Sequence, residues 1–277
     1  MQVSTNQENA IPSLLIVWSE PDGGRVDEFN DWYTHVHCHD VMRLDSSVAV
    51  QRWKFSDFQL QHHTRFVGPW QRWIAIYEVS DTVGSIRDHI DLCFGPEMLI
   101  SDAISTRNTE DFYFAPADGA KDIAQAFASR EGDIIIVGIN PSGSRDALVR
   151  WYRETYMPAT LALDGFISGN LFVATDEQLA MAVPAFAVAA IYHVEDAERA
   201  IDAFERHLSE PGSILESPLV ETAGVKVAAY SPIMKRFTAA YNDALPAEEK
   251  AIEDRVRASL GDKIHASEGT TVPFRRP

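Results

Sequence analysis

The feature of this chain that most constrains its fold is an internal repeat. Residues 32–39 and the Leu-Asp pair at 44–45 align without a gap to residues 151–158 and the Leu-Asp pair at 163–164, at a constant offset of 119 residues. Apolar runs upstream and downstream of these segments repeat as well. A repeat of this length predicts two copies of one folding unit, each of which buries its apolar face against a neighbour.

Both copies have the same order of predicted elements: strand, helix, strand, strand, helix, strand. Short apolar runs bounded by Pro and Gly predict the strands, and apolar residues at i, i+3, i+4 and i+7 predict the helices. This βαββαβ order is that of ferredoxin-like modules, an α+β class in which both helices cover one face of an antiparallel sheet. The strands are expected at 14–18, 47–56, 72–79, 110–115, 134–139, 165–174, 185–193 and 222–230, and the second helix of each copy at 82–93 and 196–208.

The expected domain organisation follows from this order. The N-terminal module, 12–116, is joined by a linker at 117–132 to the C-terminal module, 133–232. An extension follows at 233–277, with extra helices expected within 233–260. We expect the first module to be the active half and the second to be structural.

A sequence pattern after the first strand resembles a known family. Pro21, one residue and Gly23 are followed by Phe-x-x-Trp-Tyr-x-x-x-His from Phe29 to His37. This pattern is similar to the first helix of dimeric α+β barrel modules, particularly the EthD-like ones, and the resemblance covers 14–115 and 134–231. It implies that the two ferredoxin-like sheets form one barrel within a single chain. It implies little about function, because this fold hosts unrelated chemistries.

Charge and composition exclude several function classes. The chain has 24 Lys and Arg residues against 41 Asp and Glu residues, a formal net charge of −17 at pH 7. Such a field repels phosphate backbones and anionic lipids, so we expect neither nucleic acid nor a membrane as partner. No apolar run reaches the length of about 18 residues that a membrane span needs. Two cysteines and the absence of a signal-peptide pattern favour a cytoplasmic protein. Its expected partner is a small-molecule substrate, and a homodimer stays possible.

The histidines are distributed unequally between the copies. A symmetric frame that keeps titratable groups in one half predicts one working cavity and one structural copy. Six of the nine histidines lie in the first module, at 35, 37, 39, 62, 63 and 89, and only His193 and His207 lie in the second.

His37 is the strongest catalytic candidate. It lies four residues after Tyr33, so on a helix both side chains share the face turned to the sheet. A neutral imidazole is a common general base, and a tyrosine one turn away can donate to the same substrate oxygen. His89 is the third catalytic candidate, because the apolar stripe of the second helix faces the same sheet. In cyclase-type members of the resembling family this helix contributes a Tyr or His to the pocket.

His35 and His39 form an i, i+4 pair, a spacing at which two imidazoles can bind one metal ion. On a regular helix they lie opposite His37, since two residues correspond to a rotation of about 200°. We therefore expect no metal site and place this pair on a solvated helix face.

Further residues are candidates for binding the substrate. Aromatic side chains alternate along the strands of the first module and favour a flat apolar ligand. A buried arginine can hold a carboxylate or phenolate, although a salt bridge is the plainer alternative, and a histidine pair in the loop between the second and third strands can act as a lid. These candidates are Trp18, Arg52, Trp53, His62, His63, Trp73 and Tyr77.

The sequence leaves four functions open. The first hypothesis is a cofactor-independent lyase, isomerase, dehydratase or cyclase, in which a histidine base acts on a small aromatic or polyketide-like molecule in an apolar barrel cavity. The family resemblance implies two alternatives, a cofactor-free monooxygenase and a haem-binding protein with His193 or His207 as axial ligand. A non-catalytic binding module is the remaining alternative. For the first hypothesis no cofactor is expected.

Overall fold

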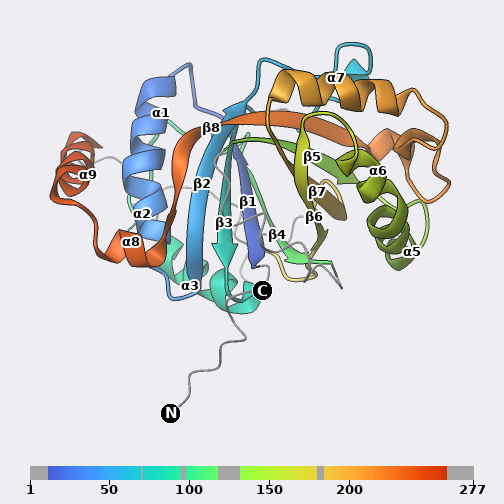
Figure 1. The fold of residues 1–277 in the computed structure, drawn as a ribbon. Coiled ribbons are helices and arrows are strands. Elements are labelled where there is room, and N and C mark those ends of the chain that lie inside the picture. The colour runs from blue at the N-terminus through green and yellow to red at the C-terminus, as the bar shows by residue number, and fades with distance from the viewer. Residues whose placement is uncertain (1–11, 70, 95–97, 118–131, 180–183, 261–277) are drawn as a thin grey trace, which may run out of the picture.

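Eight antiparallel strands form one closed barrel in the computed structural model, in the order β1-β3-β2-β8-β5-β7-β6-β4 (Figure 1). The structure describes residues 12–69, 71–94, 98–117, 132–179 and 184–260. The strands are β1 (Ser13–Ser19), β2 (Ser47–Phe55), β3 (Trp73–Val79), β4 (Glu110–Pro116), β5 (Asp133–Ile139), β6 (Phe166–Ala174), β7 (Val188–Val194) and β8 (Lys226–Thr238).

Each module has a long helix interrupted by a π-helical segment and a second, regular helix. Side chains cap several of these helices: Ser144 accepts from the Ala147 amide and Asp196 from the Arg199 amide. The helical segments are α1 (Val26–Trp32), η1 (Tyr33–His37), α2 (Cys38–Val41), η2 (Thr64–Phe66), α3 (Thr82–Phe94), α5 (Arg145–Trp151), η4 (Tyr152–Tyr156), α6 (Met157–Leu161), α7 (Ala197–Leu208), η5 (Ile214–Glu216), η6 (Thr222–Gly224), α8 (Ala239–Asp243) and α9 (Ala247–Leu260).

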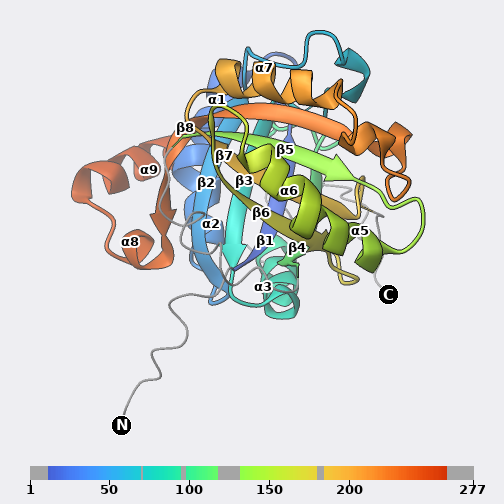
Figure 2. The same cartoon turned by 45° about the vertical axis from the view of Figure 1, so that its right-hand side comes forward.

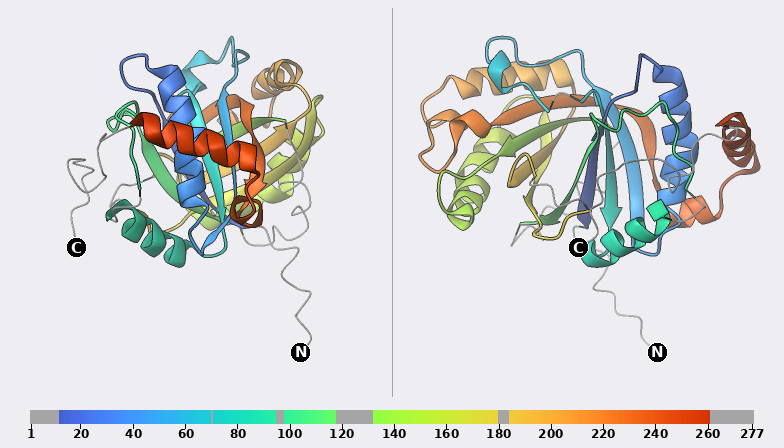
Figure 3. Two further views of the ribbon diagram at one scale, coloured as in Figure 1. Left: turned by 90° about the vertical axis from the view of Figure 1, so that its left-hand side faces the viewer. Right: turned by 180° about the vertical axis from the view of Figure 1, so that it is seen from behind.

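The predicted fold class is confirmed. Both modules have the βαββαβ order, and their sheets join at two seams, where β2 pairs with β8 and β4 pairs with β6. The views in Figures 2 and 3 show the helices of each module on the outer face of its own sheet. Closure leaves no free sheet edge at either seam, so each module satisfies the edge strands of the other. The expected linker, apart from Ala117 and Gly132, and the last part of the extension, 261–277, lie outside the described residues.

One strand differs from the expectation. β8 continues to Thr238, whereas the sequence predicts a strand ending at 230 and helices from 233, so the expected module boundary at 232 lies within a strand. The second half of β8 pairs with β2 of the other module, and the register shifts where Pro232 faces Trp53. A proline is tolerated at such an irregularity because the missing amide is not needed for the ladder. Because its pairing partner β2 is remote in sequence, the local turn signals around residue 231 wrongly predict that the strand ends there.

The hydrophobic core has three layers. Residues from both modules, including Trp18, Trp53, Ile136 and Phe172, fill the barrel interior. A second cluster lies between the first module's sheet and its helices, and a third occupies the equivalent space in the second module. Alternating strand residues therefore face either the barrel interior or a helix layer.

The C-terminal helix α9 crosses the outer surface of α1 and η1 (Figure 3). Charged pairs connect α9 to α2 and to the turn that follows it: Arg257 pairs with Asp40, and Arg43 donates to Glu253 at 2.7 Å. Asp40 and Glu253 are almost inaccessible to solvent. The extension is thus an integral part of the first module's helix layer.

Candidate functional site

The first helix of module one contains the candidate site's central residues on a π-helical turn. A π turn closes hydrogen bonds from i to i+5, so side chains five residues apart lie over one another. Accordingly the Trp32 and His37 rings stack with centroids 4.9 Å apart, and the Tyr33 ring meets His37 edge-on at 4.7 Å. The expectation of a regular helix was therefore wrong for this segment.

A cavity of about 160 Å³ lies between the first module's sheet and its helices. It brings together all three predicted catalytic residues and Tyr77. The cavity is therefore outside the barrel, and the expectation of a cavity inside the barrel was wrong, because large side chains of both modules fill that interior. The lining residues are Leu15, Val17, Trp32, Tyr33, His37, Tyr77, His89, Cys93, Met98, Ile100, Ile104, Thr106, Thr109, Asp111 and Leu179.

Both histidines of the cavity are neutral at physiological pH. Burial, the neighbouring His89 and Arg52 lower the pKa of His37 to about 3, and burial lowers the pKa of His89 to about 4. The Nδ1 atom of His37 has no hydrogen-bond partner among the described residues. His89 Nδ1 lies 3.4 Å from the Tyr113 hydroxyl, which is 2.9 Å from the Ser85 hydroxyl. His89 is thus held by a polar chain, whereas that nitrogen of His37 is available.

Tyr33 and Tyr77 provide buried hydroxyl groups beside these histidines. Burial raises the pKa of both tyrosines, so they are hydrogen-bond donors and not anions at neutral pH. The Tyr77 hydroxyl lies 3.7 Å from the Cys38 sulfur, and burial raises the pKa of this thiol to about 11. Cys38 is therefore protonated and a poor nucleophile.

Asp111 is a lining residue that the sequence reasoning missed. It lies on β4 opposite Val17 of β1, and burial raises the pKa of its carboxyl group. A raised pKa is typical of carboxyl groups that exchange protons in enzymes. The sequence pattern that could have identified Asp111 is its alternation with Phe112 and Phe114. This alternation places Asp111 and Tyr113 on the helix-facing side of the strand.

Three predicted substrate-binding tryptophans do not line the cavity. Trp18 and Trp53 point into the barrel interior, on the opposite face of the sheet. Trp73 faces the helix layer but packs against Phe29, with ring centroids 5.7 Å apart. None of the three is therefore a contact of this cavity, because alternation along a strand separates neighbours onto two faces and aromatic character does not distinguish them.

The predicted lid histidines also lie elsewhere. The backbone amides of His62 and His63 donate to Glu205 of α7 at 2.6 and 2.9 Å. This carboxylate fastens the β2–β3 loop to the helix layer of the second module. A lid role for His62 and His63 over the described cavity is therefore excluded by position.

His35 and His39 line a separate groove of about 630 Å³ between η1 and the C-terminal elements. His39 is buried, contrary to the expected solvated face, because α8 and β8 cover it. Its Nδ1 lies 2.6 Å from Asn242 Oδ1, and its ring stacks on Phe237 at 5.0 Å. Among the described residues no group of three or more His, Cys, Asp or Glu side chains could hold a metal ion.

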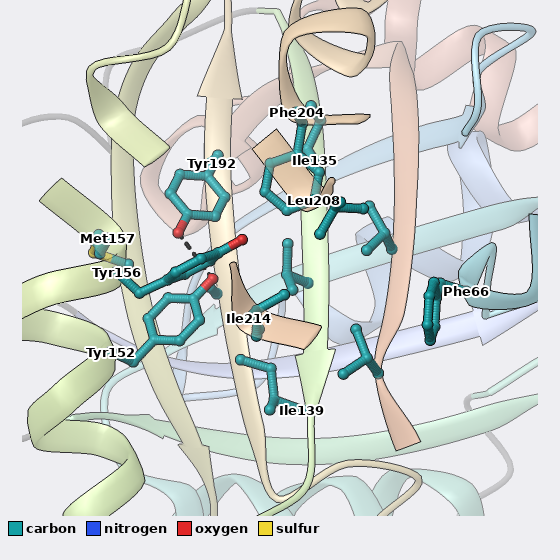
Figure 4. Close-up of a cluster of buried hydrophobic side chains, with 14 of the residues drawn as sticks. Phe66, Ile135, Ile139, Tyr152, Tyr156, Met157, Tyr192, Phe204, Leu208 and Ile214 are labelled. Carbon is teal, nitrogen blue, oxygen red and sulfur yellow. Dashed lines mark hydrogen bonds between the residues drawn. The ribbon is translucent and has the colours of Figure 1, made fainter. Parts of the chain in front are cut away.

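The second module lacks the polar set at equivalent positions. There the space between sheet and helices is filled by three tyrosines, with Tyr152 and Tyr192 hydroxyls 2.9 Å apart, and by Phe204 (Figure 4). The helix has the same π turn, and Trp151 stacks on Tyr156 at 5.4 Å. Repeat offsets and strand register pair His37 with Tyr156, His89 with Phe204, Arg52 with Leu171, and Asp111 with Val227.

Comparisons with known proteins concern the fold. No family model matches the sequence, and no curated protein matches it either. The structure resembles an anthrone oxidase-like protein, with a TM-score of 0.51 and 9% identity over 82% of this chain and 92% of that chain. For a variant chlorite dismutase from Candidatus Nitrospira defluvii the TM-score is 0.46 and the sequence identity 8%, over 89% of this chain and 95% of that chain. A haem-binding protein from Thermus thermophilus gives 0.45 and 10%, over 90% and 95%.

The closed eight-stranded barrel and the similarity to the anthrone oxidase-like protein show that the chain has the fold of a tandem dimeric α+β barrel. Within the described ranges no helix is both long enough and apolar enough to cross a membrane.

Proposed function

We propose that this protein is an acid–base enzyme that removes a proton from a small, largely apolar molecule, with His37 as the proton acceptor. The observation that carries the proposal is the asymmetry between the modules. The same fold and the same π turn occur twice, but His37, His89 and Asp111 have apolar or aromatic counterparts in the second module. The fold therefore does not need these groups, which favours a chemical role.

The proposed mechanism uses the buried groups in turn. His37 accepts the proton because its imidazole is unprotonated, and the substrate anion formed beside it offsets the cost of a buried imidazolium. The hydroxyls of Tyr33 and Tyr77 donate hydrogen bonds to the developing oxyanion. The carboxyl group of Asp111, whose pKa burial raises, exchanges a second proton with the substrate. The apolar walls exclude water and strengthen these interactions.

The cavity size limits the substrate. A cavity of about 150 Å³ holds a benzene molecule in a protein of known structure, and this one has about 160 Å³. A substrate whose reacting part is one aromatic ring or a cyclic enol fits this volume. Proton removal from such a molecule serves isomerisation, dehydration, cyclisation or a lyase reaction without a cofactor.

A second candidate is a cofactor-free monooxygenase. The fold similarity to an anthrone oxidase-like protein favours it, and the first step is the same, since an electron-rich carbanion is the species that reacts with oxygen. Oxygen consumption that depends on substrate distinguishes this function from isomerase or lyase chemistry. Binding without turnover would support the non-catalytic alternative.

The spaces between sheet and helices in the two modules do not favour a haem. The cavity of module one is close to the size of one benzene ring, far smaller than a macrocycle. In the second module the tyrosine cluster occupies the equivalent space, and the His207 imidazole lies 3.3 Å from Glu210 and packs against Tyr156.

The test is hydrogen–deuterium exchange at the carbon atoms next to the carbonyl group of small cyclic ketones in D2O, followed by NMR. We expect His37→Gln to lower the catalysed exchange rate by a factor of about 100 or more, the usual contribution of a general base. His35→Gln is the matched control, since His35 lies outside the cavity on the same π turn. Rates near those of the parent protein for H37Q would overturn the assignment.

A further inference from the structure

Arg52 is a buried cation next to the cavity. Its side chain is 1% exposed, and no carboxylate among the described residues forms an ion pair with it. The plainer alternative of a salt bridge, considered from the sequence, was therefore wrong. Burying an unpaired charge costs free energy of folding, so the presence of a buried arginine here requires an explanation.

The first helix holds the Arg52 guanidinium in one orientation. Nη1 donates to Thr34 Oγ1 at 2.5 Å, and Nη2 donates to Asn30 Oδ1 at 3.0 Å. The guanidinium carbon lies 4.2 Å from the ring centroid of Tyr33, which is one of the residues that line the cavity. The Nε atom has no hydrogen-bond partner among the described residues. Arg52 itself does not line the cavity, so its field reaches the cavity through Tyr33.

The second module shows that the fold does not require this charge. Strand register places Arg52 opposite Ala75 and its counterpart Leu171 opposite Ala190. The leucine packs against the module's filled core. The cation therefore occurs in the module whose sheet–helix space holds the described cavity, and a leucine takes its position in the other module.

From this geometry we infer that the cavity stabilises the anion that proton removal produces, a phenolate or enolate whose oxygen lies at the Tyr33 hydroxyl. A guanidinium stacked on a phenol ring makes the phenol hydroxyl a stronger donor and places positive potential behind it. Both cavity histidines are neutral, so Arg52 is the fixed positive charge near the cavity among the described residues. The inference rests on the proposed function because it names the substrate class of the same site, with Arg52 as a positioning residue.

The experiment compares two probes of the same shape, 4-nitrophenolate and neutral 4-nitrotoluene, by calorimetric titration at a pH at which the phenol is ionised. We expect the parent protein to bind the phenolate at least about tenfold more tightly. Arg52→Leu, the residue of the second module, should remove this preference while changing the affinity for 4-nitrotoluene by less than about twofold. Arg52→Lys keeps the charge and should keep most of the preference.

Equal affinities of the parent for the two probes would overturn the inference, as would an equal loss of both ligands in R52L. If R52L does not fold, two measurements still test the inference: the preference of the parent protein and the affinities of the Tyr33→Phe variant. Y33F removes only the donor hydroxyl, so it should weaken the binding of the phenolate and not that of 4-nitrotoluene. Turnover is not measured in this test. An inactive protein that prefers the phenolate would contradict the proposed function but not this inference.

Discussion

At the scale of single residues, the candidate site combines titratable groups with an apolar environment. His37 and His89 are neutral because burial disfavours their charged forms, and the carboxyl group of Asp111 has a raised pKa for the same reason. A protein that places such groups in its core loses stability at pH values where the unfolded chain would ionise them. The same burial makes them effective in catalysis, since proton transfer then occurs away from water.

His89→Phe, which introduces the second-module residue, tests this cost. Since the folded-state pKa of His89 is about 4 and the unfolded value about 6.5, the unfolded chain binds a proton first as the pH falls, so stability is lost from about pH 6.5 downward. Between pH 7.5 and pH 5 the variant should lose about 2 kcal/mol less unfolding free energy than the parent. Urea denaturation at the two pH values measures the difference.

The exposed His62 provides the control for this prediction. His62→Gln should leave the pH-dependent loss as it is in the parent protein, because the imidazole contacts water in both states. An identical loss in the parent and in H89F would show that His89 is not buried in its neutral form.

At the scale of elements, the π turn decides which side chains meet. In both modules it stacks an aromatic ring at i+5 on the tryptophan at i, as Trp32 and His37 show. The apolar periodicity predicts a helix in this place but not its hydrogen-bond pattern. A π turn amounts to one extra residue within an α-helix, and a spacing of three and four residues does not reveal it.

Deleting Glu154, an exposed residue in the π turn of module two, should convert the turn to α-helix. The helix on one side of the deletion would then rotate by about 100°, which moves either the Tyr152 ring or the Tyr156 ring away from Tyr192. We expect the free energy of unfolding to fall by about 2–4 kcal/mol, the range of disrupted cores, whereas Glu154→Ala should change it by less than about 0.5 kcal/mol. Chemical denaturation of both variants is the measurement. Equal stabilities would mean that the helix absorbs the deletion without moving its tyrosines.

At the scale of the whole molecule, barrel closure and the C-terminal extension complete the first module. β8 spans both sheets, and Arg236 on its second half donates to Glu78 of β3 at 2.6 and 2.7 Å. Helix α9 then packs against η1, and its ion pairs with Asp40 and Arg43 hold it to α2 and to the turn that follows. The π turn that carries His37 is therefore supported on its outer side by residues more than 200 positions away in sequence.

Glu253→Gln tests this support. Although burial alone would raise it, hydrogen bonds from Arg43 and Arg257 lower the pKa of Glu253 to about 2. Removing its charge leaves Asp40 as the carboxylate that still contacts both arginines, so we expect a loss of about 1–3 kcal/mol in unfolding free energy at pH 7. The contribution of Glu253 should also disappear as the pH falls from about 4.5 to 2, because the unfolded carboxylate is protonated first.

Asp254→Asn serves as the matched control for this prediction. Asp254 is 60% exposed on the same helix and pairs with Lys250, so its replacement should cost less than about 1 kcal/mol. A similar loss in both variants would show that α9 is not held by its buried charges.

The sequence by itself determined the order of elements and the face that each helix turns to its sheet, because periodicity and turn signals are local. The repeat of Trp-Tyr segments also showed that the titratable groups are concentrated in one copy, and His37, Tyr33, His89 and Tyr77 do lie around one cavity.

Only the tertiary structure decided the position of that cavity outside the barrel, since either face of an alternating strand can become the interior until the sheets close. It also decided that Asp111 enters the site and that Trp18 and Trp53 leave it. His39 is covered, and His62 is drawn toward Glu205, through contacts with residues that lie more than 100 positions away in the sequence. No local pattern carries such information, because these contacts form only when both modules and the extension pack together.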